Sequence, residues 1–415
     1  MLDAYVTTFA YSPKGLLGRT FACIPGSIGQ KLRRDFERRS LTSLPSDLVK
    51  TFPLWEVART AAAKSGCSPI FVDRIWDRLC FNFDALVAGR FVPGTAAVYA
   101  YEYTAKATFE RARAEGVAAI LDLPSLNSRA FEDLQRAEKQ RFPELRSKYD
   151  SYFEAQFERR QRRRDDEIQL ADVIVANSQL TMRSHVQGGA KPENVIVVPL
   201  ASPQPISAVA EHRDRNSPLN VVWAGNFSLG KGAHYFLEAC RQLGSARFVR
   251  TAVYGAVNLP ESALRPLPEG FTFYGTVPQP DLFAAFQTAD LLMFPTLSDG
   301  FGMVVSEAFS RGLPVITTDR AGAAELVRHG ENGLIVPAAD AAALGDALQW
   351  CLDNREKLHA MRLAALNTAK RWGWPDYRRT LVASIDQALS KKGFSTSVSR
   401  SDPRPSSVRP KAAAS

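Results

Sequence analysis

The chain has few cysteines and few histidines, and neither type is arranged as a metal site or a disulfide framework. The five cysteines among 415 residues are scattered and lack the paired spacing of metal ligands. The five histidines likewise show no spacing typical of metal ligands. The sequence therefore predicts no metal site, and its cysteine content is typical of a protein in a reducing compartment.

Long apolar runs are also absent. No window approaches the roughly 20 apolar residues that a membrane-spanning helix needs. The N-terminus has no basic segment followed by an apolar stretch, as a secretion signal would have. We therefore expect a cytoplasmic protein that is at most peripheral at the inner face of a membrane.

The net charge of +9 is distributed unevenly along the chain. Residues 1–216 carry a net +5, residues 217–390 a net −1 and residues 391–415 a net +5. A basic first half could attract an acidic membrane surface or a charged acceptor. An ordinary solvated surface explains the same excess of positive charge. We expect no nucleic acid partner.

The alternation of apolar runs and helical patterns predicts two α/β domains, each with a parallel sheet covered on both faces. A composition that is 45% apolar provides enough side chains for two cores. The expected strands of the first domain are 2–11, 96–103, 117–124, 171–178 and 194–200. Those of the second domain are 219–225, 248–255, 271–275, 290–295, 314–318 and 333–337.

The domain boundaries follow from changes in composition. The N-terminal domain is expected over residues 1–205, and a helix at about 375–390 should pack back on it. Residues 206–217 form the linker, and residues 218–374 form the C-terminal domain. The polar, proline-rich residues 391–415 are expected to be a disordered tail. The charged stretch 129–170 is expected to form one long helix, chiefly solvated.

The segment from Pro295 to Pro337 carries the most chemical information. A strand leads into the glycine-rich turn Asp299–Gly302, and a helix follows directly. Free backbone amides and the helix dipole favour a phosphate at such a helix start. Glycines permit a close approach of the ligand, and a carboxylate lies at each end of the turn, at Asp299 and Glu307. By composition alone, an ordinary loop explains the turn equally well.

As a whole, this segment resembles glycosyltransferase family 4, which comprises retaining enzymes of the GT-B fold. The family signature has two glutamates separated by seven residues and followed by a Gly-x-Pro-Val strand; here Asp299 takes the first acidic place. The resemblance continues upstream through residues 171–200 and the lysine-containing stretch 221–239, and it covers roughly residues 95–390. It implies an α/β fold of the GT-B type, with two Rossmann-like domains facing a central cleft.

The resemblance also implies roles for individual residues. Glu307 would bind the ribose hydroxyls of a nucleoside diphosphate sugar, and Asp299 with the following backbone amides would hold the donor sugar. Lys231 would neutralise the diphosphate as it leaves. The glycine turn containing Gly15 would approach the diphosphate from the other domain. The complete expected donor site is Gly15, Gly225, Asn226, Lys231, Asp299, Gly300, Phe301, Gly302, Met303, Val304 and Glu307.

The sequence departs from the family pattern at two places. The family has an arginine beside the lysine loop, whereas this chain has Asn226 and Gly230; Arg19 and Arg320 are candidate substitutes. Many members place a histidine after the strand 117–124, where this chain has Asp122. We expect Asp122 to face the cleft at the end of its strand. Glu102 is a further candidate for the acceptor side.

The function implied by the resemblance is retaining transfer of a hexosyl-type sugar from a nucleoside diphosphate sugar to an acceptor hydroxyl. The acceptor would be a glycan or a glycolipid, in polysaccharide or glycoconjugate biosynthesis. No cofactor or metal is expected, and the catalytic candidates are Lys231, Asp299 and Asp122. Two alternatives stay open: a catalytically weak GT-B protein that binds a nucleotide sugar or acts as a scaffold, and a sugar-nucleotide epimerase.

Overall fold

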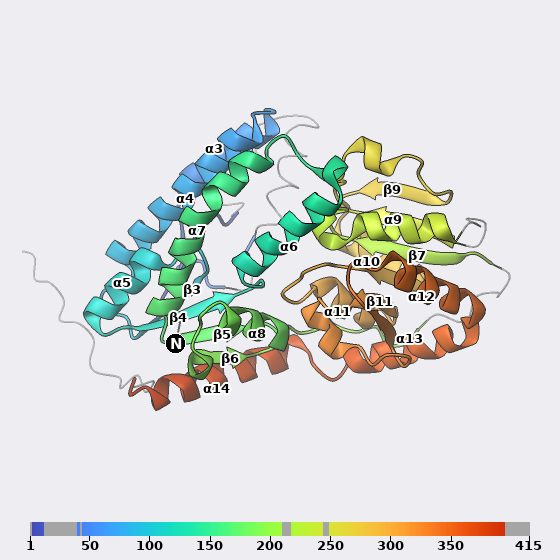
Figure 1. Ribbon diagram of the computed structural model, residues 1–415. Helices are drawn as coiled ribbons and strands as arrows, with labels where there is room; N and C mark the ends of the chain where they lie inside the picture. Colours follow the sequence, from blue (N-terminus) through green and yellow to red (C-terminus); the bar gives the residue numbers. More distant parts are fainter. Residues whose placement is uncertain (1, 12–39, 42–43, 210–216, 244–248, 395–415) are drawn as a thin grey trace, which may run out of the picture.

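The protein is built around two main parallel sheets, one in each half of the chain (Figure 1). The computed structural model describes residues 2–11, 40–41, 44–209, 217–243 and 249–394. Both sheets are flanked by helices, because every parallel connection requires a crossover that packs on a sheet face. The predictions for Gly15, Arg19 and most of the tail 391–415 lie outside the described residues.

The N-terminal half contains a four-stranded sheet in the order β3-β4-β5-β6. The short strands β1 and β2 pair with each other in a separate two-stranded sheet, so the strand expected over residues 2–11 is only three residues long. The elements are β1 (Tyr5–Thr7), β2 (Val49–Thr51), α3 (Leu54–Lys64), α4 (Pro69–Arg90), β3 (Ala97–Tyr101), α5 (Lys106–Glu115), β4 (Ala118–Leu123), α6 (Ser128–Arg141), η1 (Pro143–Leu145), α7 (Asp150–Leu170), β5 (Val173–Ala176), α8 (Gln179–Gln187), η2 (Pro192–Asn194) and β6 (Val195–Val197).

The prediction of one long solvated helix over residues 129–170 is wrong in two respects. The segment is divided into α6 and α7, because Pro143 lacks a backbone N–H and cannot continue a helix. Two arginines of α7 are also not free in solvent. Its Arg160 lies 2.6 Å from Asp73 on α4, and its Arg163 pairs with the fully buried Asp84. These arginines stabilise contacts within the protein and are not available to an acidic surface.

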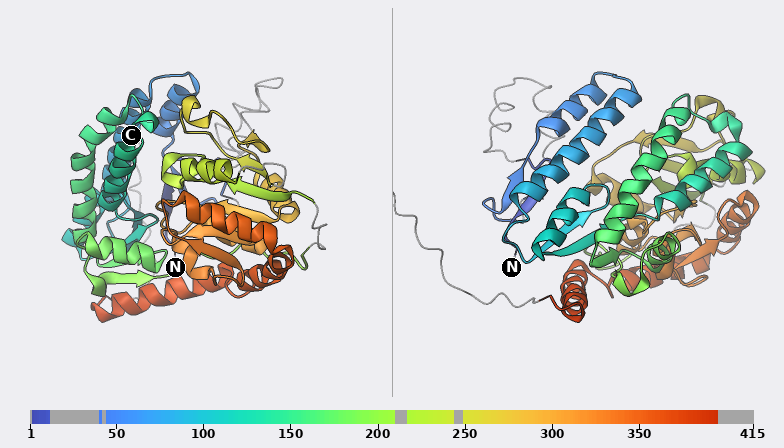
Figure 2. Two further views of the ribbon diagram at one scale, coloured as in Figure 1. Left: turned by 45° about the vertical axis from the view of Figure 1, so that its right-hand side comes forward. Right: turned by 60° about the vertical axis from the view of Figure 1, so that its left-hand side comes forward.

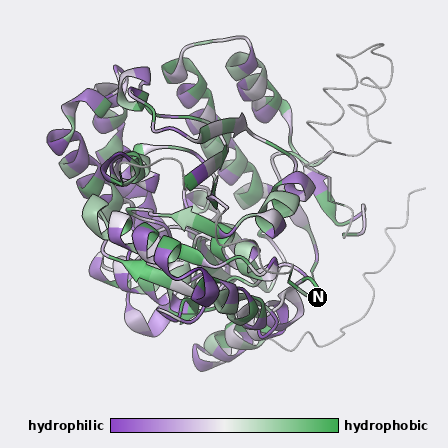
Figure 3. Cartoon of the chain, turned by 90° about the vertical axis from the view of Figure 1, so that its right-hand side faces the viewer, coloured by the Kyte–Doolittle hydropathy of each residue, from purple (hydrophilic) through white to green (hydrophobic). Residues whose placement is uncertain are grey.

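The C-terminal half contains a six-stranded sheet in the order β12-β11-β10-β7-β8-β9. Its strands are mainly hydrophobic, whereas the surrounding helices carry hydrophilic residues (Figure 3). The elements are β7 (Leu219–Ala224), η3 (Leu229–Lys231), α9 (Ala233–Gln242), β8 (Val249–Tyr254), η5 (Glu261–Leu264), β9 (Phe271–Gly275), α10 (Gln279–Thr288), β10 (Leu291–Phe294), α11 (Met303–Ser310), β11 (Val315–Thr318), η6 (Gly322–Leu326), β12 (Gly333–Val336), α12 (Ala341–Asp353), α13 (Arg355–Ala369) and α14 (Trp374–Lys391).

The direction of strand addition reverses between β7 and β10. Strands β7, β8 and β9 extend the sheet to one side, and β10, β11 and β12 extend it to the other. In open parallel sheets, ligands bind outside the carboxyl ends of the strands at such a reversal. The loops that follow β7 and β10 therefore lie where a ligand site is expected.

Several sets of contacts join the halves, among them those of α14 and α6. Helix α14 returns to the N-terminal sheet, where Leu389 packs with β4 and β5 (Figure 2). Helix α6 lies against α9: Glu138 accepts a hydrogen bond from the Tyr235 hydroxyl at 2.8 Å and contacts the His234 ring at 3.1 Å (Figure 1). The ring of Phe142 packs against the rings of His234 and Tyr235 on α9.

Candidate functional site

Lys231 lies in the loop that follows β7, at the carboxyl edge of the six-stranded sheet. The next residue, Gly232, has φ +73°, and a Cβ there would overlap the carbonyl oxygen of Pro295. Only glycine fits this close approach between the loops after β7 and β10. The amide of Leu297 also donates to the carbonyl of Gly230 at 3.1 Å. These contacts fix Lys231 beside the second loop.

Asp299 lies in the loop after β10, and its carboxylate pairs with the Lys231 ammonium. Its other carboxylate oxygen accepts a hydrogen bond from the Phe301 amide at 3.2 Å. The backbone of Asp299 is bridged to the segment after β11, because its amide donates to Arg320 O at 3.1 Å and its carbonyl accepts from Gly322 N at 3.0 Å. The structure thus brings together the two residues expected at the diphosphate and the donor sugar, although 68 positions separate them.

Helix α11 begins directly after this loop, at Met303. Gly302 precedes it with φ +86°, and no side chain caps the helix. The first amides of a helix have no acceptor within it, so an uncapped start can bind an anion. Gly302 must be glycine for a further reason, since a Cβ would lie 2.6 Å from the Phe294 ring.

Glu307 lies on α11, one turn beyond the start of the helix. Its Oε1 accepts a hydrogen bond from the Gln279 amide at 3.2 Å, at the beginning of α10. Burial raises the pKa of Glu307, while the Gln279 hydrogen bond and the nearby Arg311 lower it; the net change is upward. A partly buried carboxylate with one weak protein partner can accept hydrogen bonds from a ligand's hydroxyl groups.

The remaining donor-site predictions occupy the same edge of the sheet. Gly225, with φ +115°, turns the chain after β7, and both Gly225 and Asn226 are exposed. Gly300 is buried against the other half of the protein. The Arg320 backbone touches Asp299, but the Arg320 side chain is exposed.

Asp122 has a different environment. Along β4, Asp122 lies two and four positions after Ile120 and Ala118, so the three side chains share one face of the sheet. On this face, Ala118 and Ile120 pack with Leu389 of α14. Asp122 therefore lies on the sheet face that α14 partly covers, and its Oδ2 accepts a hydrogen bond from the Tyr99 hydroxyl at 2.6 Å. Burial raises the pKa of Asp122, and this hydrogen bond lowers it in part. Among the described residues, no contact joins Asp122 to Lys231 or Asp299.

Glu102, the other candidate for the acceptor side, is held within the N-terminal half. Its carboxylate lies 3.6 Å from the Nε of Arg164 on α7. Burial raises its pKa to about 7. The ion pair and the burial make Glu102 part of the contact between β3 and α7.

The sequence prediction missed the residues of the N-terminal half that touch the loop after β10. Ser178 and Thr181, in the first turn of α8, both contact the carbonyl of Gly300. The Leu180 amide donates to the Glu325 carboxylate at 3.2 Å. Ser178 is recognisable in the sequence as a helix cap, but no local pattern indicates a partner more than 100 positions away.

The residues of the described ranges include neither a metal-ligand cluster nor a membrane-spanning helix. These residues contain no group of three or more histidine, cysteine, aspartate or glutamate side chains that could hold a metal ion. None of the helices described is long and apolar enough to cross a membrane. The four described cysteines are all free.

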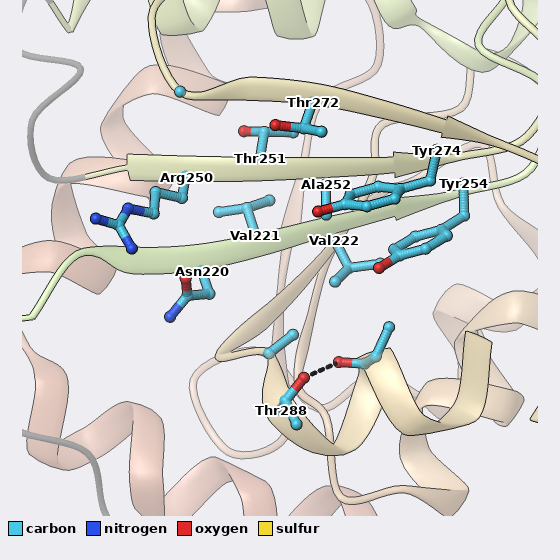
Figure 4. A pocket seen from close by; sticks show the side chains of 13 residues that line it. Asn220, Val221, Val222, Arg250, Thr251, Ala252, Tyr254, Thr272, Tyr274 and Thr288 are labelled. Atoms are coloured by element: carbon cyan, nitrogen blue, oxygen red, sulfur yellow. Dashed lines mark hydrogen bonds between the residues drawn. The ribbon is translucent and has the colours of Figure 1, made fainter. Parts of the chain in front are cut away.

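A cavity of about 410 Å³ lies elsewhere, on the face of β7, β8 and β9 beside α10 (Figure 4). Tyr254 and Tyr274 stack at one end of it, with ring centroids 4.9 Å apart. Two of its polar groups bond within the protein, Asn220 to Asp290 and Thr288 to Ala285. None of the residues predicted for the donor lines this cavity.

Comparison with known proteins gives the family. The profile of "Glycosyl transferases group 1" matches residues 218–354, which contain the lysine loop, the loop after β10 and α11. The resemblance inferred from the motifs is thereby confirmed.

Two curated relatives of this chain are named D-inositol 3-phosphate glycosyltransferases. A D-inositol 3-phosphate glycosyltransferase of Nocardia farcinica is 34% identical over 123 residues, covering 30% of this chain and 27% of the relative. Its counterpart from Corynebacterium efficiens is 27% identical over 246 residues, covering 54% of this chain and 58% of the relative. The chain thus spans about a quarter to three fifths of the length of these two relatives.

Solved structures give the fold. HepE of Anabaena, in a complex with UDP-glucose, has a TM-score of 0.55 and 16% identity, covering 88% of this chain and 90% of that one. A sucrose-phosphate synthase from Thermosynechococcus elongatus also has a TM-score of 0.55, with 15% identity and coverage of 77% and 79%. The predicted GT-B fold, with two Rossmann-like domains, is confirmed.

Proposed function

We propose that the protein is a retaining glycosyltransferase that moves a hexosyl-type sugar from a nucleoside diphosphate sugar to an acceptor hydroxyl. The observation that carries the proposal is the meeting of Lys231 and Asp299 beside the uncapped start of α11, at the strand reversal of the sheet. A cation, a carboxylate and free helix amides are the groups that a diphosphate and a sugar require. Glu307, on the same helix, supplies the acceptor for the ribose hydroxyls.

In this proposal the leaving group is stabilised by charge. As the bond between sugar and phosphate breaks, negative charge grows on the diphosphate, and Lys231 with the Met303 and Val304 amides neutralises it. The leaving phosphate oxygen takes the proton of the acceptor hydroxyl, so the reaction needs no side-chain base. Neither a metal nor a cofactor takes part, and the sugar keeps its anomeric configuration.

The acceptor is assigned only by chemical class. A glycan or a glycolipid hydroxyl is the expected acceptor, and a cytoplasmic protein, associated at most peripherally with a membrane, is the expected setting. The curated relatives act on inositol 3-phosphate according to their names. A polyol phosphate therefore belongs in the acceptor panel beside glycans and glycolipids.

The proposal is tested by incubating the purified protein with several nucleoside diphosphate sugars and these acceptors, and measuring the release of nucleoside diphosphate. We expect release with one donor, and Lys231→Ala should lower kcat roughly 100-fold or more. Glu307→Ala should weaken donor binding by a factor of about 10 to 100, because it removes hydrogen bonds to a charged group. Glu261→Ala, which changes an exposed carboxylate of the same half, is the matched control.

Other outcomes select the alternatives. Binding of a nucleotide sugar without release under any condition identifies a binding or scaffold protein. Conversion of the donor into an epimer identifies an epimerase. An inverted anomeric centre in the product contradicts the retaining mechanism and leaves the transfer itself intact.

A further inference from the structure

The start of α8 contacts residues 299–302 of the loop after β10, here called the donor loop. The Ser178 hydroxyl donates a hydrogen bond to the Gly300 carbonyl at 2.6 Å, and Thr181 Oγ1 lies 3.0 Å from the same oxygen. Both side chains are fully buried. The N-terminal half thus contacts the backbone of the loop expected to hold the donor sugar.

The approach of the two halves depends on glycine. A Cβ at Gly300 would lie 2.5 Å from Pro124 O and 2.8 Å from Ser125 Cα, so no side chain fits there. The loop that contains Pro124 and Ser125 is itself held by α8. His185 lies 3.0 Å from Ser125 O, and the Asn177 amide donates to Pro124 O at 2.8 Å. Helix α8 and this loop therefore form one surface against Gly300.

Counting protons separates the contributions of the two hydroxyls. Each hydroxyl has a single proton to donate. Ser178 accepts the amide of Thr181 at 3.0 Å and places its own proton on Gly300 O, its nearest acceptor. Thr181 has two acceptors at similar distances, Asn177 Oδ1 at 2.8 Å and Gly300 O at 3.0 Å. Ser178 is therefore the principal hydrogen-bond donor to the Gly300 carbonyl, and Thr181 shares its single proton between the Asn177 and Gly300 oxygens.

Fixing the Gly300 carbonyl also fixes the amide that follows. A trans peptide is planar, so the Gly300 C=O and the Phe301 N–H point in opposite directions. With the carbonyl held toward α8, the Phe301 N–H points away from α8, and there it donates to Asp299 Oδ1 at 3.2 Å. The orientation of one peptide thus sets both the amide and the carboxylate expected at the donor sugar.

We propose that Ser178, assisted by Thr181, is a positioning residue for the donor sugar. It acts through the Gly300–Phe301 peptide, so the donor loop adopts its sugar-binding geometry only when the N-terminal half is in contact with it. This inference rests on the proposed function, in which Asp299 and Phe301 hold the sugar. It adds a residue of the acceptor half to the binding of the donor.

The test compares two ligands, the nucleotide sugar that the protein binds and the nucleoside diphosphate alone, by calorimetry. Ser178→Ala should weaken the nucleotide sugar about tenfold and leave the nucleoside diphosphate within about twofold, because only the sugar contacts the donor loop. Thr181→Val should weaken the nucleotide sugar about threefold, and Thr181→Ser should restore wild-type affinity, because serine keeps the hydroxyl.

Ser178 is also the N-cap of α8, so a matched control is needed for the loss of a cap. Ser68 caps α4 in the same way, by accepting the Phe71 amide at 3.3 Å. Ser68→Ala should lower the thermal midpoint without changing the affinity for either ligand. Should Ser178→Ala fail to fold, the Thr181→Val and Thr181→Ser pair provides the same comparison.

Three results overturn the inference. The first is an equal loss of affinity for both ligands in Ser178→Ala, and the second is unchanged affinity for both. The third is an absence of nucleotide-sugar binding by the wild-type protein, which removes the proposed function and this inference together. The first two results leave the proposed function intact, so the two failures are distinguishable.

Discussion

Replacing Lys231 and Asp299 separately should change the affinity for a nucleoside diphosphate in opposite directions. In the ligand-free protein these two side chains pair with each other. A diphosphate therefore competes with Asp299 for the ammonium group. Lys231→Met removes the cation and should weaken binding, whereas Asp299→Asn releases the cation and should strengthen it.

The exposure of the pair decides the two magnitudes. The Lys231 and Asp299 side chains are 32% and 20% exposed, so solvent screens their attraction, and the pair contributes at most about 1 kcal/mol. Releasing Lys231 should accordingly tighten diphosphate binding by up to about fivefold. A hydrogen bond between an ammonium and a phosphate contributes about 1.5–3 kcal/mol, so Lys231→Met should weaken binding roughly 10- to 150-fold.

The assay is titration calorimetry with the nucleoside diphosphate alone, at low and high salt, without added metal. Lys357→Met is the matched control, because Lys357 lies over the Trp350 ring at 5.7 Å just as Lys231 lies over the Phe294 ring at 5.7 Å. Weaker binding in Asp299→Asn would refute the competition between carboxylate and diphosphate. Unchanged binding of the nucleoside diphosphate by Lys231→Met would show that Lys231 does not contact the diphosphate.

Three further predictions concern the fold that supports the site. Arg163→Met leaves the buried carboxylate of Asp84 without its charge partner and should lower the free energy of unfolding by about 3 kcal/mol, measured by denaturant titration. Asp122→Asn should raise the unfolding midpoint at pH 7, because burial raises the pKa of the folded carboxyl; the gain should shrink as the pH falls through this raised pKa and the wild-type carboxyl takes up a proton. Gly232→Ala should lower the midpoint by the equivalent of more than about 1–2 kcal/mol, since a left-handed backbone and an overlap with a carbonyl oxygen both oppose the added Cβ.

The variants at Arg163 and Gly232 each have a matched control in the same chain, and the variant at Asp122 is tested by its dependence on pH. Arg162→Met changes an exposed arginine of the same helix and should leave stability unchanged; an equal loss in both variants contradicts the role given to Arg163. Gly116→Ala has φ +68° and open space around the Cβ, so it measures the backbone cost alone. An effect of Gly232→Ala no larger than that of Gly116→Ala contradicts the overlap. A gain in Asp122→Asn that is independent of pH argues against a buried charge.

The order of the elements could be read from the sequence because it depends on local periodicity. The runs 290–295 and 314–318 each contain four consecutive residues that suit a buried parallel strand, Leu291–Phe294 and Val315–Thr318, and the turn Asp299–Gly302 precedes an uncapped helix. The predicted strands fall on β10 and β11, and the predicted helix falls on α11. The signature of the second half is therefore continuous in sequence, and the family could be recognised from it.

The charges of α7 show where local reading fails. The block of arginines from Arg159 to Arg164 has the composition of a solvated surface, and the sequence gives no sign of a partner. The partners lie on α4, about 80 positions earlier, and pairing with them leaves Arg160 and Arg163 mostly shielded from solvent. Composition counts charges, but burial and pairing depend on which helix packs against which.

The sequence by itself determined the two α/β halves, the family of the second half, and the residue types of the donor loop, because each depends on patterns within a few tens of residues. Only the tertiary structure decided which of these residues meet. Adjacent parallel strands place Lys231 against Asp299, and the contact of α8 with Gly300 joins the two halves at the donor loop. The tertiary structure also places the Asp122 carboxylate against the Tyr99 hydroxyl. Such contacts depend on the packing of distant segments, which local periodicity does not encode.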